Sequence, residues 1–319
     1  YKRQPVFGPS KTAAQLEGSK VFAKDLMKKY NIPTAAYGVF HKVDEAKEFI
    51  GQTGAPIVVK ADGLAAGKGV VVAMTVEEAN AAVEDMLSGN RFGNAGSTVV
   101  IEEFMEGEEA SLLAFVDGKT VVPMIASQDH KRIFDGDKGP NTGGMGTYAP
   151  APVLTDTLRD EAMKTILEPM VEAMQKEGMP YVGCLYAGLM ITPQGPKVVE
   201  FNARFGDPET QVVLPLLDSD LGQIMMACAT GTLTADMVKW KDSSAACVIL
   251  ASKGYPETSS KGDVIHGDIK QHDTTIVFHS GTKLMGDEYV TNGGRVLGVV
   301  GLGKDLRTCL LYTSPSPRD

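Results

Sequence analysis

Segment 198–209 constrains the fold of this chain most, because it combines a strand pattern with a row of polar groups. Its residues are Val-Val-Glu-Phe-Asn-Ala-Arg-Phe-Gly-Asp-Pro-Glu. Side chains alternate between the two faces of a strand, so Glu200, Asn202 and Arg204 are predicted to share one face. Two oxygen ligands beside a cation suit a polyphosphate that carries Mg²⁺, since Mg²⁺ prefers oxygen and shares its shell with phosphates. A strand with a polar edge that runs into a turn is the alternative interpretation.

The composition is ordinary for a soluble globular protein. At 319 residues the chain has room for two or more domains. The net charge is −9 with both signs interspersed, which argues against a nucleic-acid or anionic membrane surface. No apolar run approaches the roughly 20 residues of a membrane span. The four cysteines are scattered, which is typical of reduced thiols in the cytoplasm. We expect a cytoplasmic protein, monomeric, with no nucleic-acid or membrane partner.

The hydrophobic periodicity along the chain predicts an α+β fold. Short turns between the strands from 98 to 126 favour an antiparallel sheet. A stretch rich in Asp, Gly, Pro and Asn is predicted to be a long loop, at 127–152. Helices are predicted at 11–30, 75–87, 156–177 and 219–230. The second of them has Thr75 as its predicted N-cap, with Glu78 three residues on in a capping-box pattern. Strands are predicted at 55–60, 70–73, 98–104, 110–116, 120–126, 183–192, 197–202, 247–252, 275–279 and 296–300.

A glycine-rich segment at 60–70 links two predicted strands. Its sequence is Lys-Ala-Asp-Gly-Leu-Ala-Ala-Gly-Lys-Gly-Val, with glycines where a backbone can approach phosphates closely. It differs from the Walker loop in its spacing, and from the dinucleotide fingerprint because it does not open a helix. A hairpin of this kind, with Lys60 and Lys68, can close over a triphosphate. An ordinary flexible hairpin is the alternative.

An acidic run, Glu102-Glu103-Phe104-Met105-Glu106-Gly107-Glu108-Glu109, lies between two predicted strands. Five carboxylates in eight residues usually form a solvated face. The apolar Phe104 and Met105 fit another use, in which an adenine stacks there and its amine donates to a carboxylate or a backbone acceptor.

The predicted loop contains two further candidate anion sites. Lys131 and Arg132 can clamp a phosphate. Asn141, Thr142 and the amides of the glycines that follow can form a cradle for a second anion. A solvated loop with turn glycines is the alternative for both sites.

Together and in this order, segments 60–70, 101–111, 127–132, 140–145 and 186–211 resemble the ATP-grasp superfamily. Within it they are similar to the glycinamide ribonucleotide synthetase (phosphoribosylamine–glycine ligase) family, over residues 6–306. The resemblance implies an ATP-grasp fold, with two α+β lobes that clamp ATP and a small C-terminal β-rich module. It also implies ligation of glycine to 5-phosphoribosylamine, which consumes ATP and gives glycinamide ribonucleotide, ADP and phosphate. The reaction would pass through glycyl phosphate and belong to de novo purine biosynthesis, with Mg²⁺ or Mn²⁺ as cofactor.

The resemblance also implies a role for each candidate residue. Catalytic roles fall to Arg204 and Lys60, and Mg²⁺ binding to Glu200 and Asn202. ATP binding is implied for Lys20, Lys60, Gly63, Gly67, Lys68, Gly69, Glu102, Phe104 and Glu109. Of these, the glycines and Lys68 would form a flap over the phosphates. Glu102 and the Phe104 backbone would contact the adenine, and Glu109 the ribose. Binding of glycine or the phosphoribosylamine is implied for Asp129, Lys131, Arg132, Asn141, Thr142, Gly143, Gly144, Asp207 and Glu209.

The expected domains follow the same resemblance. An ATP-grasp domain covers 15–235, with about 58–126 as its mobile lobe, and an incomplete β-rich module covers 236–306. Residues 1–14 are expected to be the remnant of an N-terminal α/β domain. From Arg307 a non-native tail with no closing helix and no core role is expected, at 307–319. The chain is thus expected to be truncated at both ends.

Two alternatives to full ligase activity remain open. One is another ATP-grasp carboxylate–amine ligase, and the other is an ATP-binding fragment that binds Mg·ATP but makes product poorly.

One departure from many ATP-grasp enzymes is the strand 187–191, Ala-Gly-Leu-Met-Ile, which lacks a further acid and leaves fewer protein ligands for a metal.

Overall fold

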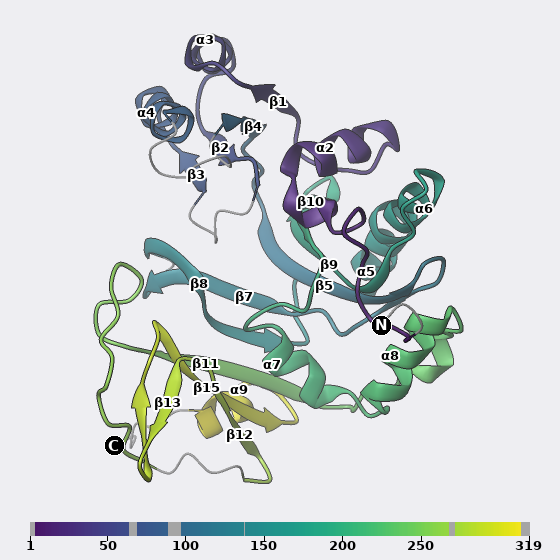
Figure 1. The fold of residues 1–319 in the computed structure, drawn as a ribbon, viewed down its shortest axis with the longest axis vertical. Helices are drawn as coiled ribbons and strands as arrows, with labels where there is room; N and C mark the ends of the chain where they lie inside the picture. Colours follow the sequence, from purple (N-terminus) through teal and green to yellow (C-terminus); the bar gives the residue numbers. More distant parts are fainter. Residues whose placement is uncertain (1–3, 64–68, 89–96, 137, 268–271, 314–319) are drawn as a thin grey trace. The chain divides into compact units, whose positions relative to one another are not determined.

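The computed structural model of the chain describes residues 4–63, 69–88, 97–136, 138–267 and 272–313. These residues form helices and antiparallel sheets, which confirms the predicted α+β class. The chain divides into two compact units, each built from three stretches of sequence (Figure 1). Unit 1 consists of Tyr1–Pro123, Val153–Arg204 and Gly222–Ala235, and unit 2 of Met124–Pro152, Phe205–Leu221 and Asp236–Asp319.

Unit 1 contains two antiparallel sheets with strand orders β1-β4-β2-β3 and β10-β9-β5-β6. Its helices are α1 (Gln15–Gly18), α2 (Lys20–Lys29), α3 (Val43–Thr53), α4 (Val76–Leu87), α5 (Asp156–Ala162), α6 (Glu168–Lys176) and α8 (Leu221–Thr230), with a π-helical turn Met163–Leu167 that joins α5 to α6. Its strands are β1 (Tyr37–Phe40), β2 (Ile57–Ala61), β3 (Val70–Ala73), β4 (Val99–Glu103), β5 (Glu108–Asp117), β6 (Val121–Pro123), β9 (Val182–Thr192) and β10 (Gly195–Asn202).

One core of unit 1 lies between the first sheet and helices α3 and α4. Apolar side chains from both layers are fully or almost fully buried there, among them Ile50, Ile57, Val83 and Ile101. Helix α4 begins at the predicted N-cap, because the hydroxyl of Thr75 accepts a hydrogen bond from the Glu78 amide at 3.2 Å. The core therefore fixes β2 and β4, whose polar side chains belong to the candidate site.

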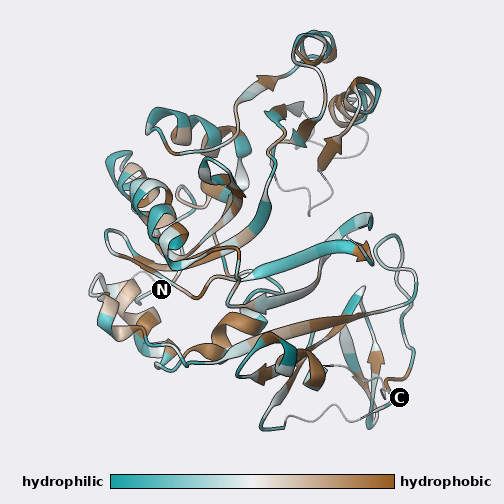
Figure 2. Ribbon diagram, turned by 180° about the vertical axis from the view of Figure 1, so that it is seen from behind, coloured by the Kyte–Doolittle hydropathy of each residue, from teal (hydrophilic) through white to brown (hydrophobic). Residues whose placement is uncertain are grey.

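Unit 2 is built on one sheet with the strand order β12-β15-β11-β8-β7, beside a small hairpin β13-β14. Strand β11, which is apolar from Ala245 to Ala251, is brown along much of its length in Figure 2. The strands are β7 (Gln128–Phe134), β8 (Lys138–Ala149), β11 (Ser244–Ala251), β12 (Thr275–His279), β13 (Thr282–Met285), β14 (Glu288–Thr291) and β15 (Arg295–Gly303). The helices are α7 (Thr210–Val213) and α9 (Leu306–Thr313), with 3-10 turns at Leu214–Leu216 and Ala235–Met237.

The prediction of a long loop at 127–152 is wrong, because most of this stretch forms the hairpin β7-β8. Strand β8 also pairs with β11, so Ala149 lies opposite Ala245 and Gly146 opposite Val248. The backbone groups of this polar, glycine-rich segment are thus satisfied by a strand about a hundred residues further along the chain. Figure 2 shows why composition misled, since β7 is teal along most of its length and β8 is mostly pale.

The predicted single helix 11–30 is two helices, α1 and α2, separated at Ser19. The Asp62 carboxylate accepts hydrogen bonds from the Lys20 amide at 2.6 Å and the Val21 amide at 3.2 Å. The Ser19 hydroxyl accepts from the Phe22 amide at 3.1 Å. These acceptors satisfy the first free N–H groups of a new helix, so α2 begins at Lys20.

The prediction that the tail from Arg307 has no closing helix and no core role is wrong for 307–313. Helix α9 covers Leu306–Thr313, and Cys309 is completely buried. The Cys309 thiol donates to the Ser244 carbonyl at 3.2 Å. A Cβ on Gly301 would lie 2.2 Å from the Cys309 carbonyl oxygen, so glycine in β15 permits the close approach of α9. Residues 314–319 of the predicted tail lie outside the described residues.

Strands in the range 58–126, expected as one lobe, belong to two different sheets. Strands β3 and β4 join β1 and β2, whereas β5 and β6 join β9 and β10. Residues 236–306, expected as a separate β-rich module, lie in unit 2. That unit also includes the hairpin β7-β8 and Phe205–Leu221.

Candidate functional site

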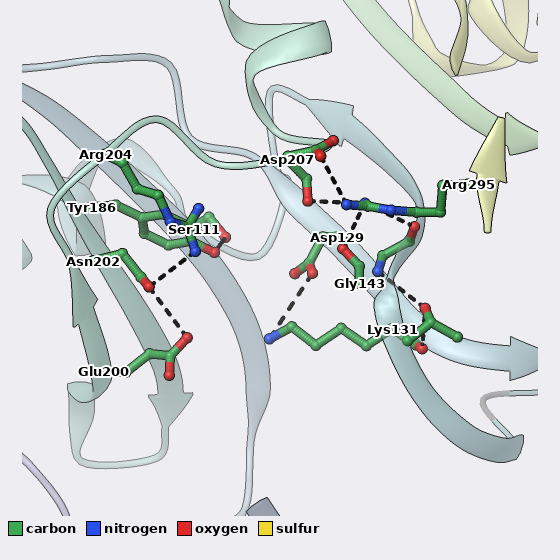
Figure 3. A network of polar contacts seen from close by, with 12 residues as sticks. Ser111, Asp129, Lys131, Gly143, Tyr186, Glu200, Asn202, Arg204, Asp207 and Arg295 are labelled. Carbon is green, nitrogen blue, oxygen red and sulfur yellow. Dashed lines mark hydrogen bonds and ion pairs between the residues drawn. The ribbon is translucent and has the colours of Figure 1, made fainter. Parts of the chain in front are cut away.

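Glu200, Asn202 and Arg204 share one side of the strand β10 and the residues that follow it, as predicted (Figure 3). Asn202 Nδ2 donates to Glu200 Oε1 at 3.2 Å, and Arg204 Nη2 donates to Asn202 Oδ1 at 3.3 Å. Val198 pairs with Leu189 and Glu200 with Gly188, so Val199 is the extra residue of a β-bulge. The bulge places Glu200 at the start of this polar row.

Arg204 is held from the other side by Glu17, a residue that the sequence reasoning did not select. Glu17 Oε1 accepts from Arg204 Nε at 2.9 Å, and Glu17 Oε2 accepts from the Ala203 amide at 2.8 Å. Glu17 therefore fixes both the side chain of Arg204 and the backbone before it. No sequence spacing signals this pair, whose members are 187 residues apart.

A buried cluster of two lysines and one glutamate joins α2, β2 and β4. Lys24 Nζ lies 3.0 Å from Glu102 Oε2, and Lys60 Nζ lies 2.9 Å from the same oxygen. Lys60 Nζ also donates to the Val199 carbonyl of the bulge at 3.1 Å. Desolvation lowers the pKa of Lys24 to about 8, against the opposing effect of Glu102. Lys60 and Glu102 are thus in direct contact, and Lys24 is an additional member.

Lys20 reaches the start of the glycine-rich segment. Its Nζ donates to the Gly63 carbonyl at 3.0 Å, and its own amide is held by Asp62. Burial lowers the pKa of Lys20, while the nearby Glu200 raises it. The structure therefore gathers four of the predicted site residues, Lys20, Lys60, Glu102 and Glu200, in unit 1. Gly69 ends the segment, with its carbonyl accepting from Ala61, whereas Gly67 and Lys68 lie outside the described residues.

The acidic run is exposed at every glutamate except the first, Glu102. Glu103, Glu106, Glu108 and Glu109 are exposed, as on a solvated face. Glu102 is 2% exposed, and its Oε1 has no hydrogen-bond partner among the residues that the structure describes. Such an acceptor fits a ligand donor, because a buried unpaired polar atom costs free energy.

Unit 2 holds a second group of predicted residues around Arg295, which the sequence reasoning also missed (Figure 3). Arg295 Nη2 donates to Asp207 Oδ2 at 2.8 Å, and Nη1 donates to the carbonyls of Gly143 at 2.8 Å and Asp207 at 3.1 Å. The Gly143 amide donates to the Tyr255 hydroxyl at 3.0 Å. A backbone turn and an acidic residue are thus fixed by one guanidinium.

The hairpin β7-β8 positions the other predicted residues of unit 2. Lys131 Nζ lies 4.0 Å from Asp129 Oδ2 (Figure 3), and the Lys131 carbonyl accepts from the Thr142 hydroxyl at 2.8 Å. Arg132 Nη1 donates to the Gly139 carbonyl at 2.7 Å, so this guanidinium supports the hairpin. Asn141 pairs with Arg132 across the hairpin, and Glu209 is buried.

The residues at the end of β10 fit a hard divalent cation only in part. Among the described ranges, no cluster of three or more His, Cys, Asp or Glu side chains is placed to hold a metal ion. Gly188, in the strand 187–191 that lacks a further acid, lies opposite Glu200. The chain offers the exposed Glu200 carboxylate and the Asn202 amide oxygen. This donor set suits Mg²⁺, which commonly keeps one or two protein ligands and completes its shell with water and substrate phosphates.

Two family models match most of the chain. The phosphoribosylglycinamide synthetase ATP-grasp (A) domain matches residues 18–210, and the phosphoribosylglycinamide synthetase C domain matches residues 245–311. The first match spans every predicted site residue, from Lys20 to Glu209.

Curated relatives and solved structures agree with this assignment. A phosphoribosylamine–glycine ligase of Halalkalibacterium halodurans is 56% identical over 302 residues, which cover 95% of this chain and 70% of the relative. The ligase of Escherichia coli O157:H7 is 55% identical over 301 residues, which cover 93% and 70%. The crystal structure of the Thermotoga maritima ligase matches with a TM-score of 0.87 and 36% identity, over 98% of this chain and 78% of that one.

A more distant match shows the fold alone. The biotin carboxylase domain of Hydrogenobacter thermophilus 2-oxoglutarate carboxylase has a TM-score of 0.75 at 18% identity, over 94% of this chain and 65% of that one. The chain is about 55% identical to the ligases but 18% identical to this carboxylase, which confirms the predicted ligase family. The chain therefore belongs to the phosphoribosylamine–glycine ligase family of ATP-grasp proteins.

Proposed function

We propose that the chain catalyses the ATP-dependent ligation of glycine to 5-phosphoribosylamine, a step of purine biosynthesis. The observation that carries this proposal is the identity of about 55% to phosphoribosylamine–glycine ligases over more than nine-tenths of the chain. The buried Lys24–Lys60–Glu102 cluster and the row from Glu200 to Arg204 give it chemical support.

The proposed reaction has two steps. A glycine carboxylate oxygen attacks the γ-phosphorus of ATP, the bond to the β–γ bridging oxygen breaks, and ADP leaves. The amine of phosphoribosylamine then attacks the carbonyl carbon of glycyl phosphate, phosphate leaves, and the nitrogen loses a proton. Both steps depend on positioning and on stabilisation of charge more than on a protein nucleophile.

The residues of unit 1 are proposed to bind ATP and support phosphoryl transfer. Lys20 and Lys60 approach the phosphates, with Gly63 and Gly69 as further contacts. Glu102 and the Phe104 backbone take the adenine, and Glu109 the ribose. Arg204, oriented by Glu17, stabilises the negative charge that develops on the transferred phosphoryl group.

The residues of unit 2 are proposed to bind the other two substrates. The turn at Gly143 and Gly144 presents a backbone that Arg295 holds in place. The remaining proposed contacts are Asp129, Lys131, Arg132, Asn141, Thr142, Asp207 and Glu209.

Glu200 and Asn202 are proposed to hold Mg²⁺ or Mn²⁺, which offsets negative charge on the ATP phosphates. In this structure Asn202 Oδ1 accepts from Arg204, and Glu200 Oε1 accepts from Asn202. A metal ion would compete with these hydrogen bonds for the same oxygens. Glu200 is exposed, so its second carboxylate oxygen adds capacity for a ligand contact.

A monomer in the cytoplasm is proposed for the chain. All four cysteines are free and buried, and burial raises the pKa of Cys247 to about 12, which fits unreactive thiols in a reducing compartment. Among the described residues, the structure contains no helix that is both long and apolar enough to cross a membrane.

The test is direct detection of glycinamide ribonucleotide by mass spectrometry, with glycine, phosphoribosylamine, ATP and Mg²⁺ all supplied. Phosphate release that requires both glycine and the amine supports the proposal. Calorimetric titration with ATP separates binding from turnover. ATP binding without product would favour the second hypothesis, a nucleotide-binding chain without ligase activity.

A further inference from the structure

We propose that Lys24 is a positioning residue, which holds the Glu102 carboxylate so that the ATP site selects a nucleotide with a 6-amino group. The inference rests on the proposed ATP site and adds a residue that determines its base specificity. Lys24 was not among the residues that the motifs single out, although its spacing of four from Lys20 gives a signal in the sequence.

Lys24 lies on the buried face of α2 and is 2% exposed. Its ammonium group donates to the Thr34 hydroxyl at 2.8 Å and lies 3.0 Å from Glu102 Oε2. Thr34 in turn donates to the Val198 carbonyl at 2.7 Å. The ammonium group is therefore tied to the backbone of β10 through one hydroxyl and cannot turn away without losing that link.

Lys60 approaches the same oxygen of Glu102 and is tied to the next carbonyl of β10, that of Val199. Two consecutive backbone carbonyls at the β-bulge thus anchor two ammonium groups, and both groups meet at Glu102 Oε2. Both contacts hold the same carboxylate oxygen in place. Hydrogen bonds between ionised partners are stronger than those between neutral groups, so the Glu102 carboxylate is held firmly in this position.

The other oxygen of Glu102 is left as an acceptor. Oε1 is buried and has no hydrogen-bond partner within the described ranges. A carboxylate group only accepts hydrogen bonds when it is ionised. A 6-amino group donates to such an oxygen. A 6-oxo group, as in hypoxanthine, presents lone pairs there and leaves the buried acceptor unpaired.

The experiment compares the binding of ADP and IDP, which differ at position 6 of the base, by calorimetric titration. Lys24→Met keeps the unbranched stem but removes the charge, which leaves Lys60 as the sole cation on Glu102 Oε2 among the described contacts. We expect the ratio of the IDP to the ADP dissociation constant to fall about tenfold. Lys28→Met, an exposed lysine one turn further along the same helix, is the matched control and should leave the ratio unchanged.

Thr34→Val is the second variant, because it removes the hydroxyl that anchors Lys24 but keeps every charge. It should lower the same ratio by a smaller factor, and it decides the question if Lys24→Met does not fold. If Lys24 had only a structural role, its replacement would weaken the binding of ADP and of IDP by the same factor. An unchanged ratio in both variants, with normal ADP binding by the unmodified chain, would overturn this inference alone. Failure of the unmodified chain to bind ADP would overturn the proposed ATP site as well.

Discussion

Arg295 donates hydrogen bonds to both the carboxylate and the backbone carbonyl of Asp207. Nη2 donates to Oδ2 at 2.8 Å and Nη1 donates to the carbonyl oxygen at 3.1 Å. The two residues are 88 positions apart in the sequence. The same group donates to the Gly143 carbonyl. A planar fork of donors can serve three acceptors at once, which a lysine cannot do in the same geometry. Arg295 is therefore the residue that brings these segments of unit 2 together.

Replacing Arg295 with lysine should destabilise the protein by about 1–3 kcal/mol, since hydrogen bonds to charged groups are lost and their carbonyl acceptors remain. The free energy of unfolding in urea measures the effect. Arg159→Lys is the matched control, because Arg159 pairs with Asp156 and Asp160 on an exposed helix face. A surface pair of this kind contributes about 1 kcal/mol or less. Equal losses in the two variants would contradict the role given to Arg295.

A second prediction concerns Gly144, which has a φ of +110°. A Cβ at this position would lie 2.5 Å from Pro208 Cδ. Gly144→Ala should therefore lower the melting temperature and the ligase turnover together, because both the backbone conformation and the contact oppose a side chain. Gly18→Ala in α1 is the control and should be neutral or stabilising. Apart from its chain neighbours and the backbone of its own helix, no atom of the described residues lies within 4 Å of its Cβ position. A melting temperature unchanged in Gly144→Ala would refute the constraint.

Local sequence patterns were enough to predict most elements of the fold. The strands β9 and β10, the helix α4 with its Thr75 cap, and the shared face of Glu200 and Asn202 follow from periodicity and capping within about a dozen residues. The resemblance to known motifs supplied the family, which the comparisons confirm.

Contacts between distant segments could not be predicted in this way. The hairpin β7-β8 reads as a loop because its partner β11 follows about a hundred residues later. The break between α1 and α2 depends on Asp62, and the orientation of Arg204 depends on Glu17. Each of these interactions requires knowledge of which segments meet in space, and no local pattern holds that information.

A third prediction tests the role of Glu200 at the proposed metal site. Glu200→Gln keeps the shape of the side chain but removes its charge, so turnover should fall by at least about tenfold if a divalent cation binds there. Stability should change by less than about 0.5 kcal/mol, because Glu200 is exposed. Phosphate release at several Mg²⁺ concentrations and urea unfolding measure the two effects. Glu172→Gln, on the exposed face of α6, should alter neither. Unchanged turnover in Glu200→Gln would refute the metal role.

The last prediction follows from the lowered pKa of Lys24. This pKa is about 8 in the folded protein against 10.5 for an ordinary lysine, because burial disfavours the ammonium form more than Glu102 favours it. Between these two pH values the unfolded chain retains a proton that the folded protein has lost. The Lys24 contribution to the free energy of unfolding must therefore increase as the pH rises through this window, and it must be least favourable below pH 8.

Urea unfolding of the unmodified chain and of Lys24→Met, at pH values on both sides of this window, isolates the contribution. The stability of the unmodified chain minus that of the variant should increase with pH, since methionine does not titrate. Lys28→Met should track the unmodified chain throughout, because its exposed ammonium group has no contact that the structure records. A difference between the unmodified chain and Lys24→Met that stays constant or falls with pH would show that Lys24 keeps its proton across the window, so that Glu102 and Thr34 compensate its burial in full.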